Sequence, residues 1–271
     1  MCRLVGSVAR DPVSLRHELL DAADPLIHAS GENDSGWGMA VYPGGEGEAP
    51  RCTRFPDQAG ASGQFEAAAD QRGRILMAHV RKATVGGLTE ENTHPFCLGE
   101  YAFCHNGTLG HPEKLLEHHR GNGPSGDTDS EHLFHRLLRE VNPAPDRVVE
   151  GLRAAVTAAA RCAPLSALNF LFSDGLYLYA YRLGLFELHW LRRDGQVVVA
   201  SERITDENWH DVRQDVLLVM KPGDDEPHAE RLIGDEALAA IQIDPFDDGS
   251  ELRGAERGRF AAERAPAPTS E

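Results

Sequence analysis

The sequence predicts an α+β fold built from antiparallel sheets with separate helices. Strand-like segments come first, two helical segments follow, and further strand-like segments begin at residue 168. This order differs from the regular alternation of strand and helix that is typical of a parallel sheet. Ser173-Asp174-Gly175 lies between two apolar runs and signals a hairpin, so the later strands are expected to be antiparallel.

The N-terminal third contains one helical pattern and several strand patterns. Apolar side chains at Val13, Leu15 and Leu19 have helical spacing, which predicts a helix over 13–22. Turn-forming residues are dense over 43–63 and predict a long loop or an irregular hairpin. Strands are predicted at 36–42, 74–80 and 100–105.

Two helices and a second set of strands are predicted after residue 127. Thr128 and Glu131 have the spacing of a capping box, so a helix is expected to begin there and to run to residue 141. A second helix is expected at 146–162. The strands that follow are predicted within 168–182, where the hairpin lies, and at 187–193, 196–202 and 215–223.

Composition narrows the classes of protein to consider. The chain has 271 residues, 41% of them hydrophobic, and a formal net charge of −16, which argues against binding to nucleic acid or to an anionic membrane. We found no signal peptide and no apolar run of the roughly 18 residues that a membrane helix needs. Five cysteines without a CxxC pair predict reduced thiols in the cytoplasm. We expect one domain over 2–247 and a disordered tail over 248–271.

Cys2 is the first candidate for a chemical role. Its small side chain permits removal of Met1, which would leave a thiol and a free α-amine on the same residue. Such a residue could act as a nucleophile that carries its own base. The alternative is that Cys2 is an incidental residue at the start of a buried strand.

Two segments at predicted strand ends carry further candidates. Arg81, with Thr84 nearby, offers a planar fork for a carboxylate, although a surface ion pair would explain the arginine equally well. Asn106 and Gly107 follow a buried strand. They could form a turn, or their amide groups could stabilise an oxyanion.

The remaining candidates are a carboxylate, an aromatic residue with its glycine, and several histidines. Asp129 lies in the first turn of a predicted helix, where the helix dipole favours a carboxylate and where it could bind an ammonium group. Trp37 and Gly38 could pack in the core or line a ligand site. The histidines of 111–119 and 131–135 are explained by solvated helix faces, so no metal site is predicted.

These segments occur together in a familiar order. The sequence resembles the class II glutamine amidotransferases, which use an N-terminal nucleophile. It is most similar to small stand-alone members such as the γ-glutamyl amidohydrolase of ergothioneine synthesis. The resemblance covers about residues 2–220. It rests on the segments MCRLVG, DSGWGMAVY, AHVRKAT, NTHPF, FCHNGTL and TDSE.

The resemblance implies a fold and a role for each candidate. The fold is a four-layer αββα sandwich of two antiparallel sheets, the N-terminal-nucleophile hydrolase fold. The reaction is hydrolysis of the γ-amide of glutamine or of another γ-glutamyl amide, through a thioester. The implied roles are nucleophile for Cys2, oxyanion stabilisation for Asn106 and Gly107, α-carboxylate binding for Arg81 and Thr84, α-ammonium binding for Asp129, and pocket lining for Trp37 and Gly38. His94 matches the NTHPF segment without a chemical step, and it is kept as a substrate-site candidate.

The sequence leaves more than one alternative for the molecule that receives the ammonia. No nucleotide fingerprint, phosphate loop or sugar-isomerase segment occurs, so no cofactor is predicted. The ammonia acceptor could be a synthase on a separate chain, or the substrate could be a larger γ-glutamyl amide that is simply hydrolysed. A different class of function also remains open, namely a regulatory subunit that binds γ-glutamyl compounds without turnover.

Overall fold

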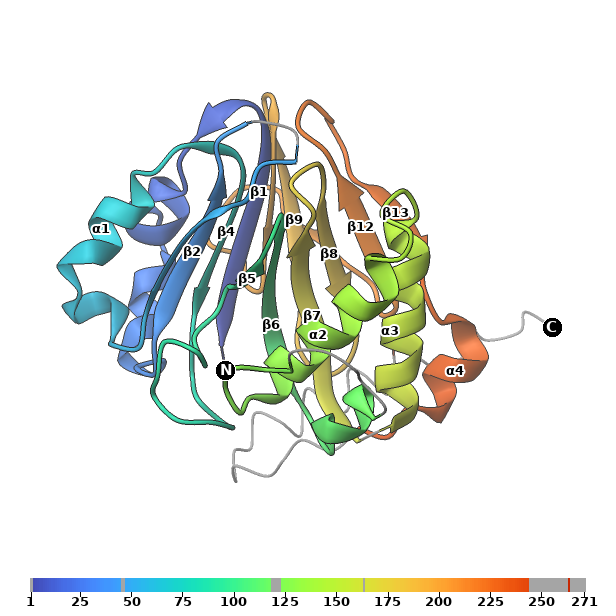
Figure 1. Cartoon of the computed structure of the whole chain (residues 1–271). Helices are drawn as coiled ribbons and strands as arrows, with labels where there is room; N and C mark the ends of the chain where they lie inside the picture. Colours follow the sequence, from blue (N-terminus) through green and yellow to red (C-terminus); the bar gives the residue numbers. More distant parts are fainter. Residues whose placement is uncertain (1, 45–46, 118–122, 163, 244–262, 264–271) are drawn as a thin grey trace.

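Two antiparallel sheets face each other and form the centre of the molecule (Figure 1). The structure is a computed structural model that describes residues 2–44, 47–117, 123–162, 164–243 and 263. The first sheet has the strand order β11-β9-β10-β1-β4-β2-β3, and the second has the order β13-β12-β8-β7-β6-β5.

The strands of the first sheet come from both halves of the chain. They are β1 (Arg3–Val13), β2 (Trp37–Tyr42), β3 (Arg51–Phe55), β4 (Gly73–Val80), β9 (His189–Arg193), β10 (Gln196–Ala200) and β11 (His210–Asp211). The second sheet contains β5 (Phe96–Leu98), β6 (Tyr101–Leu109), β7 (Leu165–Ser173), β8 (Leu178–Arg182), β12 (Val216–Met220) and β13 (His228–Arg231).

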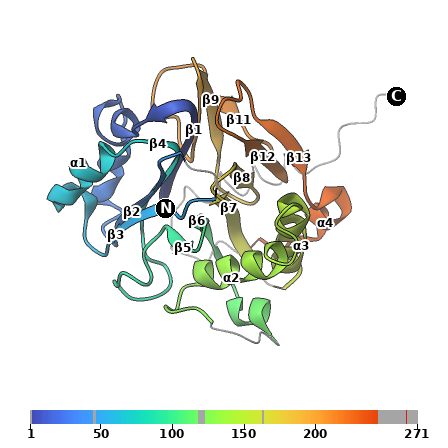
Figure 2. The ribbon, with the colours of Figure 1, turned by 45° about the horizontal axis from the view of Figure 1, so that its top comes forward.

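Helices cover the outer face of each sheet, which makes four layers (Figure 2). The α-helices are α1 (Gly63–Ala69), α2 (Asp129–Val141), α3 (Val148–Cys162) and α4 (Gly234–Ala240). The short helical turns are η1 (His17–Asp21), η2 (Leu26–Gly31), η3 (Ala59–Ala61) and η4 (Pro112–Leu116). Separate apolar clusters fill the space between the sheets and the space under each helical layer. The predicted αββα sandwich is therefore confirmed.

The strand register brings the start of β1 next to the end of β4. In the β1–β4 ladder Arg3 pairs with Val80, so the residues on either side of this pair meet at one end of the first sheet. In the second sheet, β6 ends at Leu109 and α2 begins at Asp129, and the backbone amide of Leu109 donates to the Asp129 carboxylate at 2.7 Å. The start of β1 and the ends of β4 and β6 thus form a single region, next to the N-terminus in Figure 1.

The prediction of a helix over 13–22 is wrong. Strand β1 continues to Val13, which pairs with Gly73, and only His17–Asp21 forms a short π-helical turn. Leu15 and Leu19 are both buried in the apolar cluster under this layer. A compact turn therefore buries both leucines, as a helix would, and this is why their spacing resembled that of a helix.

The start of α2 agrees with the capping prediction in one half of the motif. The Thr128 hydroxyl accepts from the Glu131 backbone amide at 3.2 Å, as a capping box requires. The Glu131 carboxylate, however, accepts from the amides of Ser125 and Gly126, both at 2.7 Å. Glu131 therefore orders the turn that leads into the helix, including the residues just before Asp129.

A disulfide joins the two sheets at one edge, contrary to the prediction that the cysteines are all reduced thiols. Cys52 on β3 and Cys97 on β5 are bonded, with Cα atoms 6.8 Å apart. These strands are end strands of different sheets. The bond joins residues 45 apart in sequence, so only the facing of the two sheets brings them together. Cys2 and Cys104 are free.

Neither a membrane-spanning helix nor a metal-binding cluster is found among the described residues. None of the helices described here is long and apolar enough to cross a bilayer. Within the same ranges, no group of three or more His, Cys, Asp or Glu side chains is placed to hold a metal ion. The predicted tail, 248–271, lies outside the described residues except for Glu263, so the domain boundary stays a prediction.

Candidate active site

Cys2 lies immediately before β1, beside the residue that follows Arg81. Its Sγ is 3.3 Å from the backbone nitrogen of Lys82 and 3.4 Å from the Lys82 carbonyl oxygen. The sulfur can therefore accept from the amide and donate to the carbonyl of the same residue. The β1–β4 register explains this contact, because it places the start of β1 against the end of β4.

The surroundings of Cys2 hold its thiol in the protonated form. Burial raises the pKa of the Cys2 thiol, while the Lys82 amide and the positive charge of Arg81 lower it in part. The carboxylate of Asp129 also raises this pKa. The thiol is thus neutral in the resting protein, and nucleophilic attack requires a base that takes its proton.

Arg81 is almost fully buried and organises the chain around it. One Nη donates to the carbonyls of Gly87 at 2.9 Å and Ser35 at 3.4 Å, and the other donates to Val85 at 2.8 Å. The guanidinium therefore holds the segment that follows β4 in a defined position. Its positive charge interacts with both Cys2 and Asp129, so these three groups share one electrostatic environment.

Asn106 and Gly107 lie within β6, paired with Asn169 and Leu168 of β7, so the strand predicted at 100–105 continues past them to Leu109. Asn106 is buried, and its side-chain amide forms no hydrogen bond with another described residue. A Cβ added at Gly107 would lie 2.0 Å from the Ala167 carbonyl oxygen, so only glycine fits at this position. A side-chain amide that bonds no other described residue, beside a backbone that cannot carry a side chain, can stabilise a negatively charged oxygen.

Histidine side chains on both sides of this segment support it. His79 Nε2 donates to the His105 carbonyl oxygen at 3.1 Å, and burial lowers the pKa of His79 to about 3. Burial also lowers the pKa of His105, whose Nε2 faces the Ala167 carbonyl at 3.2 Å and whose Nδ1 faces the Ser130 hydroxyl at 2.9 Å. Since a carbonyl only accepts, Nε2 of His105 carries the proton and Nδ1 accepts from Ser130.

Asp129 contributes a buried carboxylate to the same region. One of its oxygens accepts from the Leu109 amide at 2.7 Å, which ties α2 to the end of β6. Burial raises the pKa of Asp129, and its backbone hydrogen bonds and the proximity of His105 oppose this effect. A carboxylate at this depth gains from pairing with a cation, which is what binding of an ammonium group would supply.

A clasp of two residues connects the segment after β4 to the turn before Asp129, and sequence reasoning missed it. The Asn92 amide donates to the Asp127 carboxylate at 2.7 Å and to the Gly87 carbonyl at 3.2 Å, and its oxygen accepts from the Asp127 amide at 3.0 Å. The NTHPF segment contained this signal, since Asn92 is its first residue. Asn92 thereby couples the chain held by Arg81 to the chain that carries Asp129.

Two further candidates are placed next to this region. The Thr84 hydroxyl lies 3.3 Å from the Thr108 hydroxyl, which joins the segment after β4 to the end of β6. His94 is buried and packs on His79, with ring centroids 4.3 Å apart, and neither of its ring nitrogens has a hydrogen-bond partner among the described residues. Its position supports His79 and leaves no contact that indicates a chemical step.

Trp37 and Gly38 contribute to packing rather than to a ligand site. Trp37 is 1% exposed, packs between Phe55 and Phe65, and belongs to the cluster under the outer helical layer. It therefore leaves almost no surface for a ligand. A Cβ added at Gly38 would lie 2.4 Å from the His94 carbonyl oxygen, so Gly38 allows that segment to approach β2 closely.

The structure thus brings most of the predicted residues to one place. Cys2, Arg81 and Asp129 interact electrostatically, while Thr84 and Asn106 lie on the segments that adjoin them. The backbone of Trp37 pairs with Val80, but its ring packs in the apolar cluster under the outer helical layer. The cluster combines a thiol, a cation, an anion and an amide without a hydrogen bond, which is the set needed to bind a zwitterion and attack its carbonyl.

Comparison with known proteins identifies relatives among the glutamine amidotransferases. The family described as "Glutamine amidotransferases class-II" matches residues 1–195. MJ1515 of Methanocaldococcus jannaschii, named as an uncharacterized protein, is 30% identical over 259 residues, which is 83% of this chain and 70% of MJ1515. The Escherichia coli protein named "Putative glutamine amidotransferase YafJ" is 30% identical over 213 residues, which is 74% of this chain and 80% of YafJ.

The same architecture occurs in a solved structure. Glutamine phosphoribosylpyrophosphate amidotransferase of Bacillus subtilis, in complex with ADP and GMP, superposes with a TM-score of 0.64 at 18% identity. The match covers 85% of this chain and 49% of that chain, so the present chain corresponds to about half of it. At 18% identity, this similarity shows that the two proteins share a fold and shows nothing further.

Proposed function

This chain belongs to the class II glutamine amidotransferases, and we propose that it uses Cys2 to hydrolyse a γ-glutamyl amide. The observation that carries the proposal is the meeting of the Cys2 thiol with Arg81 and Asp129 at one end of the sandwich. A glutamyl group has an α-carboxylate and an α-ammonium, so one cation and one anion near a nucleophile match its charges.

The proposed reaction begins with removal of Met1, which leaves Cys2 with a free α-amine. The amine takes the thiol proton, directly or through water, and the sulfur attacks the δ-carbonyl carbon of the substrate. The Asn106 amide and the Gly107 backbone amide stabilise the oxyanion. The protonated amine then gives its proton to the departing nitrogen, and ammonia or an amine leaves. Water cleaves the thioester, which releases glutamate and restores the thiol.

We further propose that the substrate is a γ-glutamyl amide larger than glutamine. The motivation is the absence of any nucleotide or sugar-phosphate motif that would indicate an acceptor within this sequence. Free glutamine is then a slow substrate, and a larger γ-glutamyl amide, as in the ergothioneine-type reaction, or a partner synthase gives the full rate. Equal rates with glutamine and with every larger amide, without stimulation by a partner, would contradict this part.

The experiment that tests the proposed function blocks and then releases the α-amine. The sequence ENLYFQ, placed between Met1 and Cys2, is expected to reduce turnover of γ-glutamyl amides to near background, because an amide nitrogen cannot accept the thiol proton. Cleavage by the tobacco etch virus protease after this sequence exposes Cys2 as the first residue and is expected to restore activity. Ammonia or amine release is measured before and after cleavage, with intact mass to identify the N-terminus.

Two outcomes of this experiment would overturn the proposal in different ways. Full activity of the uncleaved, extended chain would exclude the α-amine as base. Calorimetric binding of glutamine without any release of glutamate, in a chain shown by mass to begin at Cys2, would support the regulatory subunit instead.

Arg81→Lys is expected to lower kcat/KM by at least about tenfold, mainly through a higher KM, because lysine keeps the charge and loses the planar fork. The same change removes some of the contacts to Val85 and Gly87. A substrate without the α-carboxylate, 4-aminobutyramide, separates the two effects: if Arg81 binds that carboxylate, the variant loses little further activity on this substrate.

Lys82→Arg is the matched control for Arg81→Lys. Lys82 is exposed and is close to Cys2 through backbone atoms only, so this change is expected to leave KM and kcat unaltered. An equal loss of activity on both substrates in Arg81→Lys would instead assign Arg81 a purely structural role.

A further inference from the structure

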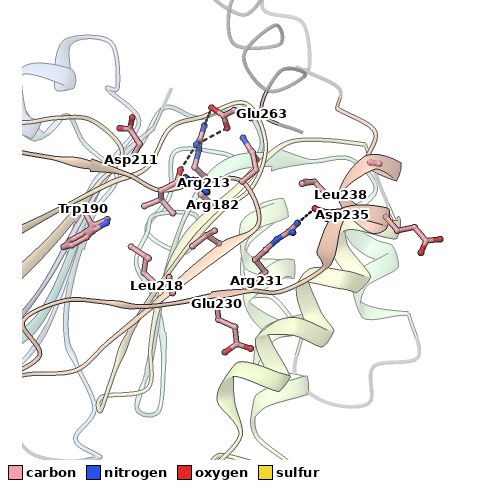
Figure 3. A pocket seen from close by; sticks show the side chains of 16 residues that line it. Arg182, Trp190, Asp211, Arg213, Leu218, Glu230, Arg231, Asp235, Leu238 and Glu263 are labelled. Atoms are coloured by element: carbon pink, nitrogen blue, oxygen red, sulfur yellow. Dashed lines mark hydrogen bonds and ion pairs between the residues drawn. The ribbon is translucent and has the colours of Figure 1, made fainter. Parts of the chain in front are cut away.

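The Cys52–Cys97 disulfide lies at the edge of the sandwich that is nearer to the candidate active site. It joins β3, which is two strands from β4, to β5, which is next to β6. At the opposite edge, a cavity of about 1140 Å³ lies between β9 and β11 of one sheet and β12 and β13 of the other (Figure 3). Charged side chains line that cavity, among them Arg182, Asp211 and Arg231. The covalent bond between the sheets is thus found on the side where the segments of the site lie.

Cys97 anchors the segment that carries the Asn92 clasp. Strand β5 begins directly after this segment, and its residues pair with β6. So short a strand is at the lower limit of strand lengths, and pairing with β6 restrains it only weakly. Asn92 bonds both the segment after β4 and Asp127. The bond from Cys97 to Cys52 therefore restrains the part of the chain from which Asn92 connects the end of β4 to the start of α2.

The same segment supports the oxyanion side of the site through two histidines. His94 packs on His79, with ring centroids 4.3 Å apart. His79 Nε2 donates to the carbonyl oxygen of His105 at 3.1 Å, and His105 directly precedes Asn106. A displacement of His94 would therefore reach the strand that carries Asn106 through one ring contact and one hydrogen bond.

An ion pair runs beside the disulfide and is the weaker of the two connections. Arg54 of β3 pairs with Glu90 at 3.5 Å, and Glu90 is exposed. Exposed ion pairs contribute little to stability because solvent and salt screen them. The disulfide thus provides most of the restraint between β3 and the segment that follows β4.

The disulfide is accessible to a reductant. Cys52 is exposed and Cys97 is half-buried, whereas the free thiol of Cys104 is fully buried. Thiol–disulfide exchange requires that a thiolate reach one of the two bonded sulfur atoms. A reductant in solution can therefore attack this bond at Cys52.

Reduction by a dithiol proceeds in two exchanges. One thiolate of the dithiol attacks Sγ of Cys52, the bond between the two cysteines breaks, and Sγ of Cys97 leaves as a thiolate that takes a proton. The second thiolate of the dithiol then attacks its own first sulfur, which frees Cys52 as a thiolate that also takes a proton. The dithiol leaves as a disulfide, so two electrons and two protons pass from it to the cysteines.

We propose that the Cys52–Cys97 disulfide is a redox-sensitive restraint that positions the substrate-binding part of the active site. In the oxidised protein it holds the Asn92 clasp and His94 in place. In the dithiol form both gain freedom, and substrate binds more weakly. This proposal rests on the proposed function for the identity of the substrate, whereas the contacts that carry it do not involve Cys2.

A redox titration of the full chain, shown by intact mass to begin at Cys2, tests the proposal. Mixtures of oxidised and reduced dithiothreitol set the state of the disulfide, and alkylation followed by mass spectrometry measures it. Cys2 stays a free thiol, because its mixed disulfide with dithiothreitol breaks down by ring closure. As the disulfide is lost, KM for a γ-glutamyl amide should rise about five- to tenfold with kcat changed less than about twofold, which is the lower range of coupling between separate sites.

Two further measurements need no turnover. The calorimetric Kd of glutamine should rise by a similar factor when the disulfide is reduced. Hydrogen exchange should become faster for amides of 87–98 and 125–129, while amides of α3 should not change.

Cys104→Ala is the matched control, because it removes a free thiol and keeps the disulfide. This variant should retain the whole redox response. The double variant Cys52→Ala, Cys97→Ala should instead show the higher KM in every dithiothreitol mixture.

Three results would overturn the proposal. Equal KM, Kd and exchange in the oxidised and reduced chain would mean that the disulfide does not restrain the site. A redox response that persists in the double variant would assign the response to another thiol. A change in kcat with unaltered KM and Kd would place the effect on the chemical step. Absence of turnover in both redox states would overturn the proposed function instead, and the Kd and the exchange rates would then decide the present proposal.

Discussion

Cys2→Ser is expected to slow turnover by at least about a hundredfold and to leave substrate binding nearly unchanged. The structure explains why the loss should fall on the chemical step. The hydroxyl can keep the contacts to the Lys82 backbone that Sγ now makes, and the clamp formed by Arg81 and Asp129 is not altered. A hydroxyl, however, is far less acidic than a thiol, so the same base yields far less of the attacking anion.

The measurement is kcat for a γ-glutamyl amide, together with calorimetric binding of the same compound. Cys104→Ala is the matched control, since Cys104 is a free and fully buried thiol in the cluster between the sheets. We expect this control to lower the free energy of unfolding and to leave kcat unchanged. An unaltered kcat in Cys2→Ser would remove Cys2 from the reaction.

Asn106→Ala is expected to lower kcat by about a hundred- to a thousandfold, which is the range for loss of one oxyanion donor. The Asn106 amide has no hydrogen bond within the described ranges, so its removal should cost little stability. The effect should therefore appear in kcat, with KM and the unfolding midpoint close to those of the unmodified protein. Steady-state kinetics and urea unfolding measure the two quantities on the same preparations.

Asn92→Ala provides the contrast that makes this prediction specific. The Asn92 side chain makes three hydrogen bonds, to Gly87 and Asp127, so its loss should loosen the clasp and lower stability. If Asn106→Ala lowers stability as much as Asn92→Ala while kcat is retained, Asn106 is a structural residue and the oxyanion donor must be sought elsewhere.

The sequence predicted the elements whose signals are local. The helices at 128–141 and 146–162 and the hairpin at Ser173-Asp174-Gly175 were predicted within a few residues of the observed α2, α3 and β7–β8. In each case a periodic pattern and a cap or turn residue lay side by side in the chain. The helix over 13–22 failed because a turn buried Leu15 and Leu19 at the same spacing.

Most residues of the candidate site could also be predicted from the sequence, because each lies in a recognisable motif. Cys2, Arg81, Asn106 and Asp129 were each selected by a motif, and the structure places them on adjoining segments. Trp37 was selected in the same way and lies in the core instead. A motif identifies a residue, whereas the face of the strand on which that residue lies decides whether it can contact a ligand.

The sequence by itself therefore determined the family, the residue types that can carry the chemistry, and the elements with local periodicity. Only the tertiary structure decided which residues meet. Cys2 contacts Lys82, 80 positions away, the Cys52–Cys97 bond spans 45 positions, and Glu263 reaches Arg182 across 81 positions. The physical reason is that these contacts depend on strand register and on the facing of two sheets, which are properties of the whole packed chain and leave no pattern in neighbouring residues.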